Sequence, residues 1–315
     1  MLKLVFIFFY ISLLSTLTFS FFDLPWWLDN LSNVILIWIA LLFIAAPFLL
    51  LTFKRYALLL LMPTFVLTIY HLLPIFHSKA ITDTRVKLKS YRFIQANLSY
   101  YNNNLGDFFT ASNNIASDFI FLFEYNVQKR EQLKRFANGK HMYGYEEIQG
   151  FPLGIAVVSN YPIVYSRLHK SNSKSAEILE LKFFDKKINK IIHSFLLHPP
   201  SPRTQINWEI RNDLFNKLNT LIEKNSSEHT LIAGDINVSP WSFNFPKPEK
   251  FTPCYLGNQY FSSWQFEKNF PKAVITSLID HCFYNSGFSL INYRHIPVNG
   301  SDHQALVYQL QLVQK

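Results

Sequence analysis

The ten residues 231–240, LIAGDINVSP, decide how the larger part of this chain folds. An apolar run leads into Gly234 and Asp235, and Asn237 follows two positions later, before Pro240 stops the segment. In a β-strand, residues i and i+2 share a face, so the carboxylate and the amide point into one space. Gly234 permits close approach of another backbone. The stretch therefore predicts a buried strand whose end presents an acid and an amide together.

Other apolar runs of the chain also end in acidic, amide, hydroxyl or imidazole side chains. These residues are Asn97, Glu124, His198, Asp280, His281, Ser301, Asp302 and His303. Taken singly, each has a structural interpretation, because Asp and Asn favour turns and a lone histidine is more often a hydrogen-bonded structural residue. Taken as a set, they fall at the ends of separate strands, which is where open α/β architectures gather their sites. We therefore expect them to converge.

The residue types in this set are suited to phosphoester chemistry. Carboxylate and amide oxygens are ligands that Mg²⁺ prefers, and imidazole and amide donors bind phosphate oxygens. A carboxylate beside a held water can act as a general base. Together they predict metal-assisted attack of water on a phosphoester. Zinc hydrolysis is the competing interpretation, but its HExxH spacing is absent from the sequence.

The alternation of short apolar runs and polar segments predicts an α/β domain. Predicted strands cover residues 91–98, 119–124, 154–159, 229–235, 278–284 and 303–310. A hairpin pair is predicted at 176–184 and 190–198. Residues 207–224 have helical spacing, with Trp208 and four leucine or isoleucine side chains on one face. About ten strands with few helices predict two packed sheets flanked by helices.

The order of these motifs resembles the endonuclease/exonuclease/phosphatase superfamily. QAN, E, H, GDIN, IDH and GSDH follow one another from residue 95 to residue 303, and GDIN together with SDH is the more specific part. GIAVVSNYPI, residues 154–163, is similar to the family's central strand and turn, and GDINVSPWS is similar to a branch of membrane-anchored bacterial members. The resemblance covers residues 91–315. It implies an α/β four-layer sandwich, with two packed mixed β-sheets flanked by helices.

The resemblance also implies a divalent-metal site. Glu124 would be the chief metal ligand, with Asn97 and Asp302 completing or supporting the site. The expected cofactor is Mg²⁺, with Mn²⁺ as a substitute. His281 could face this site or be structural. Gln304 stands where the family commonly has a proline, and this departure removes no expected chemical role.

The same resemblance implies the catalytic roles. Asp235 would align and deprotonate the attacking water, and Asn237 would hold that water or a phosphate oxygen. His198 and His303 would donate hydrogen bonds to the phosphate and stabilise the charge that develops in the transition state. Asp280 would fix the tautomer of His303, as a carboxylate behind an imidazole generally does.

Three stretches near the start of the chain carry no charged residue. They cover residues 4–22, 31–53 and 56–76, and each is about as long as a helix that crosses a bilayer. Buried core helices are the alternative, but three such stretches in succession, in a chain that is 49% hydrophobic, favour membrane helices. We therefore expect three N-terminal transmembrane helices ahead of the sandwich.

The charges that flank these stretches predict their orientation. Lys3 precedes the first stretch, and Lys54 and Arg55 separate the second from the third, whereas the first connection carries Asp23 and Asp29 and no base. Lys and Arg favour the cytoplasmic side. We therefore expect a multi-pass protein of the cell membrane whose catalytic domain is extracytoplasmic, whether or not the first stretch is cleaved as a signal peptide.

The composition divides the chain into three parts. They are a transmembrane region, residues 1–76, a polar linker, residues 77–90, and a catalytic domain, residues 91–315. Three of the 30 Lys and Arg residues and two of the 21 Asp and Glu residues precede residue 77, so the remainder carries a formal charge of +8. A basic domain suits a polyanion or an anionic membrane, and an ordinary solvated surface explains the charge equally well.

The chain has two cysteines, too few for a disulfide framework. Cys254 and Cys282 could form one bridge. We expect two buried, unpaired thiols.

The sequence leaves the substrate open. The expected function is that of a membrane-anchored, divalent-metal-dependent phosphoesterase. Its substrate would be nucleic acid, as for a nuclease, or a phospholipid headgroup, as for a sphingomyelinase. A non-catalytic membrane module that binds a phosphorylated ligand is the second hypothesis. The lipid bilayer is the expected partner of the N-terminal helices.

Overall fold

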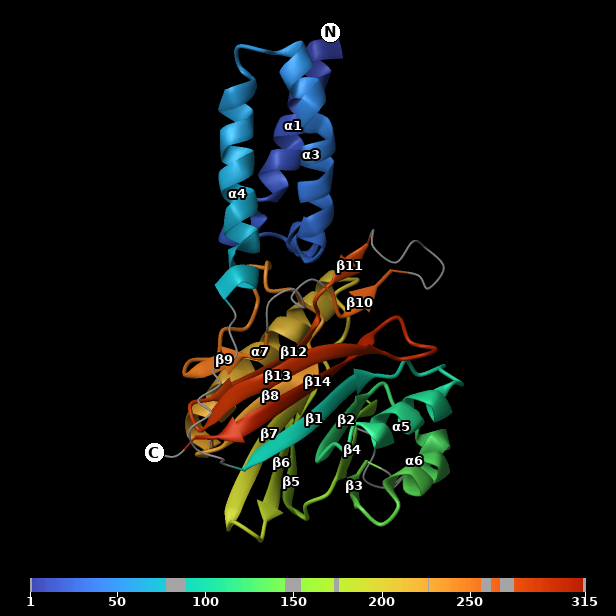
Figure 1. The fold of residues 1–315 in the computed structure, drawn as a ribbon. Coiled ribbons are helices and arrows are strands. Elements are labelled where there is room, and N and C mark those ends of the chain that lie inside the picture. Colours follow the sequence, from blue (N-terminus) through green and yellow to red (C-terminus); the bar gives the residue numbers. More distant parts are fainter. Residues whose placement is uncertain are drawn as a thin grey trace.

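The computed structural model describes most of the chain. The described segments are residues 2–77, 89–144, 154–172, 176–225, 227–255, 262–266 and 275–313. Nearly all of the predicted linker, residues 77–90, lies outside them. Figure 1 shows a bundle of long helices standing on one end of a β-sandwich.

The N-terminal helices follow the apolar stretches of the sequence. The long helices are α1 Leu2–Thr16, α3 Ile35–Thr52 and α4 Ala57–His77. Short helical turns join the first two, namely η1 Phe19–Phe21, α2 Trp26–Asp29 and η2 Asn30–Val34. We call residues 25–34 the connector. Two segments, Lys3–Phe21 and Trp26–Thr52, are long and apolar enough to cross a membrane, whereas Ala57–Leu73 is a shorter apolar helix. The third predicted span therefore stays a prediction.

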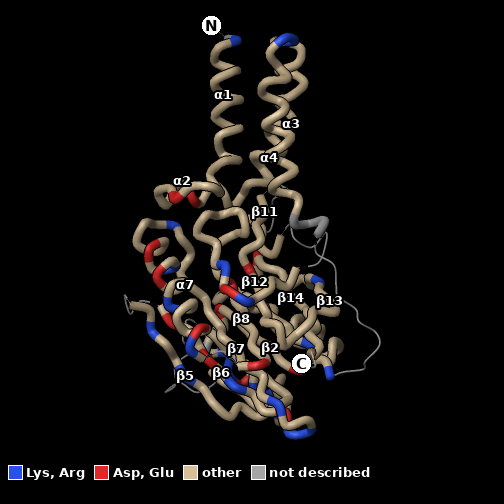
Figure 2. The backbone as a smooth tube through the Cα atoms, turned by 90° about the vertical axis from the view of Figure 1, so that its left-hand side faces the viewer, with Lys and Arg blue, Asp and Glu red and all other residues tan. Residues whose placement is uncertain are grey.

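The outer surface of this helical bundle is apolar. Figure 2 shows the three long helices free of charged residues except near their ends. Phe8 in α1 and Ile44 in α3 are each 74% exposed, and Met62 in α4 is 72% exposed. A contiguous apolar surface of this kind is typical of contact with lipid or with another protein.

Sheet 1 has the order β13-β14-β1-β2-β4-β3. Its strands are β1 Ser90–Asn97, β2 Phe119–Phe123, β3 His141–Tyr143, β4 Ala156–Ser159, β13 Phe288–Pro297 and β14 Gln304–Leu312. β1 pairs parallel with β2 and antiparallel with β14, so the sheet is mixed. β2 is buried along its whole length, which is why its sequence is an unbroken apolar run rather than an alternating one.

Sheet 2 has the order β5-β6-β7-β8-β12-β9. Its strands are β5 Ile163–Lys170, β6 Glu177–Asp185, β7 Lys190–Leu197, β8 Thr230–Asp235, β9 Phe251–Pro253 and β12 Asp280–Asn285. The predicted hairpin is confirmed as β6 and β7, while β7 pairs parallel with β8. A separate two-stranded ribbon consists of β10 Trp264–Gln265 and β11 Thr276–Ser277.

The two sheets pack face to face, with helices on both outer faces. Phe93 and Phe119 stack at 4.8 Å between ring centroids, and Phe183 from sheet 2 meets Phe119 edge-on at 4.8 Å. The outer helices are α5 Leu105–Asn114, α6 Arg130–Ala137, preceded by η3 Val127–Lys129, and α7 Gln205–Asn225. α5 and α6 share an apolar cluster with sheet 1, and α7 shares one with sheet 2. The predicted four-layer sandwich is therefore confirmed.

The cysteines correct one prediction. Cys254 and Cys282 form a disulfide bridge, whereas we expected unpaired thiols. Cys254 directly follows β9 and Cys282 lies in β12, and these strands pair antiparallel. Their Cα atoms are 5.3 Å apart, within the range that a disulfide spans. The pairing joins residues that are 28 positions apart, so the linear sequence did not reveal it.

A buried imidazole on sheet 2 predicts acid sensitivity of the fold. His193 is fully buried and contacts Glu180 Oε1 at 2.8 Å. Burial outweighs the attraction of Glu180 and lowers the pKa of His193 from 6.5 to about 4. Between pH 6.5 and about pH 4, His193 is protonated in the unfolded chain and neutral in the folded chain. The free energy of unfolding therefore decreases as the pH falls. From about pH 7 to about pH 5 we expect a loss of about 2 kcal/mol from this group.

Urea unfolding at the two pH values would measure this loss. His193→Gln is the matched variant, because its amide keeps a donor toward Glu180 and does not titrate. An equal pH dependence in the variant would contradict the assignment.

Candidate active site

The predicted site residues meet at one pocket of about 830 Å³. Asn97, Glu124, His198 and Asp235 stand at or just after the carboxyl ends of β1, β2, β7 and β8. β12 runs antiparallel to β8, with Asp280 opposite Asp235, so its first residue enters at the same edge. Six predicted residues line the pocket, namely Glu124, His198, Asp235, Asn237, Asp302 and His303. Asn97 and Asp280 are buried and contact these residues, because Asn97 hydrogen-bonds Asp235 and Asp280 hydrogen-bonds His303.

An amide links the two nearest carboxylates. Asn97 Nδ2 donates to Glu124 Oε1 at 3.0 Å and to Asp235 Oδ2 at 2.9 Å. Its own oxygen accepts the Ser99 backbone N–H at 2.9 Å. In this network Asn97 turns its nitrogen toward the carboxylates and orients them, so its predicted role as an oxygen ligand of the metal stays a prediction.

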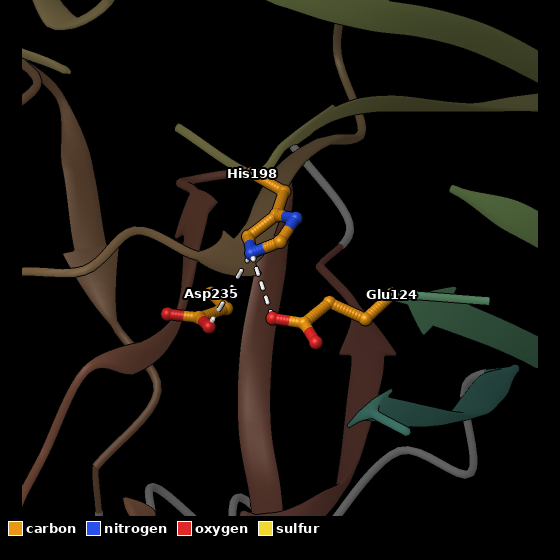
Figure 3. A group of neighbouring side chains, drawn as sticks. All are labelled: Glu124, His198 and Asp235. Atoms are coloured by element: carbon orange, nitrogen blue, oxygen red, sulfur yellow. Dashed lines mark ion pairs between the residues drawn. The ribbon is translucent and has the colours of Figure 1, made fainter. Parts of the chain in front are cut away.

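His198 faces both carboxylates. Figure 3 shows its Nε2 directed toward Glu124 and Asp235, 3.6 Å from Glu124 Oε1 and 3.6 Å from Asp235 Oδ2. The Glu124 side chain keeps 27% of its surface exposed, while the side chain of Asp235 is 2% exposed. Glu124 is therefore the carboxylate that faces the open pocket, and Asp235 forms the floor.

Asp280 and His303 form a buried acid–imidazole pair. His303 Nδ1 donates to Asp280 Oδ2 at 2.8 Å, which leaves Nε2 pointing to Asp235 Oδ2 at 3.7 Å. Burial by itself lowers the pKa of His303, but the charges of Asp280 and Asp235 and the hydrogen bond to Asp280 outweigh burial, and the pKa rises to about 10. His303 is therefore a cation that can donate a hydrogen bond into the pocket.

The groups around Asp235 shift its pKa in opposite directions. Burial raises its pKa, as does the negative charge of Asp280, while His303, His198 and the hydrogen bond from Asn97 lower it. The net result is a pKa of about 6. A carboxylate with a pKa near the working pH is suited to accepting a proton.

One site residue has a strained backbone, and a second shares its conformation. Glu124 has φ +52° and Asn237 has φ +53°, the left-handed region, which asparagine adopts readily and glutamate rarely does. Such strain is held in place by the surrounding structure and clusters at functional sites. Gly234 is required for a different reason, because a Cβ there would lie 1.9 Å from the Leu197 carbonyl oxygen. The close backbone approach predicted for Gly234 is therefore confirmed.

The remaining predicted residues have other partners. Asp302 lines the pocket, but its Oδ2 accepts the Trp264 indole N–H at 2.8 Å. Asn237 Nδ2 donates to the Pro199 carbonyl at 3.0 Å. His281 is fully buried, and its Nε2 contacts the Val238 carbonyl at 2.9 Å. Of the two interpretations left open for His281, the structure supports the structural one.

Ser301, which the sequence placed in the converging set, braces two site strands: its Oγ donates to the Asn97 carbonyl and accepts the His303 N–H. Other pocket residues were given no role in the predicted site. Trp264 and Phe266 lie on or beside β10 and line the pocket. The connector also contributes to the wall through Asn30, Asn33 and Val34. No motif marks these residues, because they reach the pocket only through tertiary packing.

The donor set fits a hard divalent cation. Glu124, His198 and Asp235 each offer one ligand atom, and these atoms lie within 4.8 Å of one another. Asp235, Asp280 and His303 form a second such group that shares Asp235. Two carboxylates joined by one amide at an open pocket are the chemistry that Mg²⁺ or Mn²⁺ prefers. Asp302 belongs to neither group, so its predicted role as a ligand stays a prediction.

Comparison with known proteins agrees with this fold. The sequence matches the endonuclease/exonuclease/phosphatase family over residues 94–303. A humanized D. rerio TDP2 with 14 mutations superposes with a TM-score of 0.57 and 15% identity, covering 70% of this chain and 99% of that one. An endonuclease/exonuclease/phosphatase family protein from Bacteroides thetaiotaomicron gives a TM-score of 0.57 and 15% identity, covering 73% and 100%. A comparison with curated proteins gives no match.

The sandwich, with its pocket of carboxylate, amide and imidazole groups at the strand ends, defines the class of α/β four-layer sandwich proteins, as the sequence motifs indicated. The family match extends over two thirds of the chain and contains every predicted site residue. The chain belongs to the endonuclease/exonuclease/phosphatase family.

Proposed function

We propose that this protein is a membrane-anchored, divalent-metal-dependent phosphoesterase. The observation that carries the proposal is the convergence of Glu124, His198, Asp235 and His303 on one pocket. Members of the family hydrolyse phosphoesters, and the chemistry of this donor set is suited to that reaction. We place the catalytic domain at residues 91–315, after a linker at 77–90 and a membrane region at 1–76.

The proposed metal site centres on Glu124. Glu124 is the chief ligand because its carboxylate is the one that faces the open pocket, and Asn97 holds it in place. Asp302 is proposed as a supporting ligand. A bound Mg²⁺, or Mn²⁺ in its place, would neutralise phosphate charge and help to acidify water.

The proposed catalytic residues have separate roles in accepting and donating protons. Asp235 orients the attacking water and accepts its proton. His198 and His303 donate to the phosphate oxygens, and Asn237, which lines the pocket, holds the water or a phosphate oxygen. Asp280 keeps His303 protonated and in one tautomer, which its 2.8 Å hydrogen bond supports.

The proposed topology is multi-pass, with the catalytic domain extracytoplasmic. Two long apolar helical segments support anchoring in a membrane. Lys3, Lys54 and Arg55 flank the ends of the long helices away from the sandwich, where Figure 2 shows basic residues, and this arrangement favours a cytoplasmic location for those ends. The Cys254–Cys282 bridge supports an oxidising compartment. A reporter fused after Lys315 should read as extracytoplasmic.

The test of the activity uses the full chain in detergent with a soluble phosphodiester, bis(p-nitrophenyl) phosphate, and added Mg²⁺ or Mn²⁺. EDTA would remove the metal ion, and Glu124→Gln would remove its chief proposed ligand. Each is expected to lower turnover at least about a hundredfold, because the positive charge that stabilises the transition state is lost. Glu131→Gln is the matched control, since Glu131 is an exposed acid on α6.

Two results would contradict this proposal. Turnover that survives Glu124→Gln would point to a different site or to a contaminant. Binding of a phosphate ester without any turnover would favour a non-catalytic module with a phosphatase-like cleft.

A further inference from the structure

The connector is bonded to the sandwich along its length. Asn30 Nδ2 donates to the Pro202 carbonyl at 2.6 Å. The Ser239 N–H donates to Asn33 Oδ1 at 2.8 Å, and Ser277 Oγ donates to the Asn33 carbonyl at 2.7 Å. Two loops of the sandwich and strand β11 therefore hold the segment that joins α1 to α3.

A buried ion pair fixes the connector to the catalytic machinery. Asp29 Oδ2 lies 3.1 Å from Arg211 Nη2, and the side chains are 2% and 0% exposed. Trp208 Nε1 and Ser242 Oγ also donate to Asp29, at 2.7 and 2.6 Å. Arg211 Nη1 donates in turn to the Asn237 carbonyl at 3.0 Å. Arg211 therefore links the connector directly to the loop that carries Asn237.

The connector also forms one wall of the pocket. Asn30, Asn33 and Val34 line the pocket together with Glu124 and His303. Val34 is the last residue before α3, which is the most apolar of the long helices. The pocket thus lies at the level where the apolar helices end, and Figure 1 shows β10 and β11 on the same side of the sandwich.

Large apolar side chains project around this end of the sandwich. We call Trp27, Ile206, Phe243 and Phe266 the rim. They are 55%, 68%, 44% and 47% exposed. Trp27 belongs to the connector, and Phe243 follows Ser242, which bonds the connector's Asp29. Ile206 lies in the first turn of α7, the helix that contacts α2. Phe266 lines the pocket. Exposed aromatic and aliphatic residues beside the end of a membrane helix are typical of the headgroup layer.

The charges of the pocket do not suit a polymer of phosphates. Binding of nucleic acid takes several Lys or Arg contacts to successive phosphates. Among the described pocket-lining residues Arg203 is the only Lys or Arg. One guanidinium beside two imidazoles matches a single phosphate group better than a strand.

We propose that the substrate is a phosphoester carried by a lipid of the same membrane, whose headgroup enters the pocket between the connector and β10. The proposal rests on the phosphoesterase activity proposed above. Water adds to phosphorus, the P–O ester bond breaks, and the proton from water ends on the leaving oxygen. The rim inserts among the headgroups and holds the pocket at their level.

The catalytic test compares three substrates with the full chain in proteoliposomes. The first substrate is the lipid of vesicles made from equal parts of phosphatidylcholine, phosphatidylglycerol and sphingomyelin. The second is single-stranded DNA, and the third is bis(p-nitrophenyl) phosphate. We expect release of phosphorylated headgroups or phosphate from the lipids, with kcat/KM at least about tenfold above that for DNA. Trp27→Glu combined with Ile206→Glu is expected to lower lipid turnover about tenfold relative to turnover of the soluble diester.

A second readout needs no activity. The described residues contain no free cysteine, so Ile206→Cys can carry a single bimane label. In vesicles with brominated acyl chains, this label is expected to be quenched. Lys186→Cys is the matched control, because Lys186 is exposed in the β6–β7 turn, at the opposite end of sheet 2 from the pocket.

The outcomes separate the two proposals. Turnover of the soluble diester without lipid turnover, or a preference for DNA, would overturn the lipid substrate and leave the phosphoesterase standing. An unquenched label at position 206 would overturn the insertion of the rim. Absence of turnover with every substrate would remove the phosphoesterase, and the lipid substrate with it.

Discussion

Asp235→Asn is expected to lower kcat/KM for any phosphoester substrate by about 10² to 10⁴, the usual contribution of a general base. The change removes the proton acceptor at the floor of the pocket and leaves its shape almost unaltered. Asp235 is 1% exposed and lies beside Asp280, and together these raise its pKa to about 6. Steady-state kinetics with bis(p-nitrophenyl) phosphate would measure the loss.

The same variant is not expected to lose stability. A carboxylate whose folded pKa is raised from 3.8 to about 6 destabilises the folded state above that pH, because the unfolded chain ionises more easily. Removing this charge should leave the thermal midpoint unchanged or raise it. Activity lost at constant or increased stability is the signature of a catalytic group. Asp107→Asn is the control, since Asp107 is an exposed acid on α5. A variant that unfolds more readily would refute this interpretation of Asp235.

The sequence was informative where strand ends coincide with function. Asn97, Glu124, His198 and Asp235 each follow an apolar run that is buried in the structure. Since the carboxyl ends of parallel strands meet at one edge, their convergence could be predicted from local patterns alone. Asp280 lies at the start of its strand, and its place in the site depends on the antiparallel pairing of β12 with β8. The sequence pattern had placed Asp280 in the set because an apolar run precedes it, and the family resemblance supplied its role beside His303.

Other features depend on contacts that no local pattern encodes. Trp208 fits the apolar face of its helix by spacing, yet its indole bonds Asp29 across 179 positions of sequence. The charge of Asp29 was interpreted only as a signal of membrane orientation, because an isolated acid in an apolar region carries no sign of its partner. Strands β5 and β13 were also missed. Five of the eight residues of β5 have charged, hydroxyl or imidazole side chains, and both strands lie at the edge of a sheet. Edge strands bury less and leave a weaker pattern.

The largest effect on stability is expected from Arg211→Met. The substitution leaves the carboxylate of Asp29 buried and without its counter-ion, and it takes a donor from the Asn237 carbonyl. Breaking a buried pair by removing one partner costs about 3–5 kcal/mol. Chemical unfolding of the full chain in detergent would measure this cost. Arg135→Met is the control, because Arg135 is an exposed arginine in the last turn of α6.

The double variant Arg211→Met with Asp29→Asn decides between loss of packing and loss of charge balance. If the unpaired charge of Asp29 is the cause, removing it should restore a large part of the stability, since replacing both members of a buried pair is often close to neutral. If the double variant is as unstable as the sum of the single ones, the pair is not the link between the connector and the sandwich. Because Arg211 also holds the backbone of Asn237, turnover should stay low in the double variant even where stability returns. That separation would show that the segment between two apolar helices positions a residue of the active site.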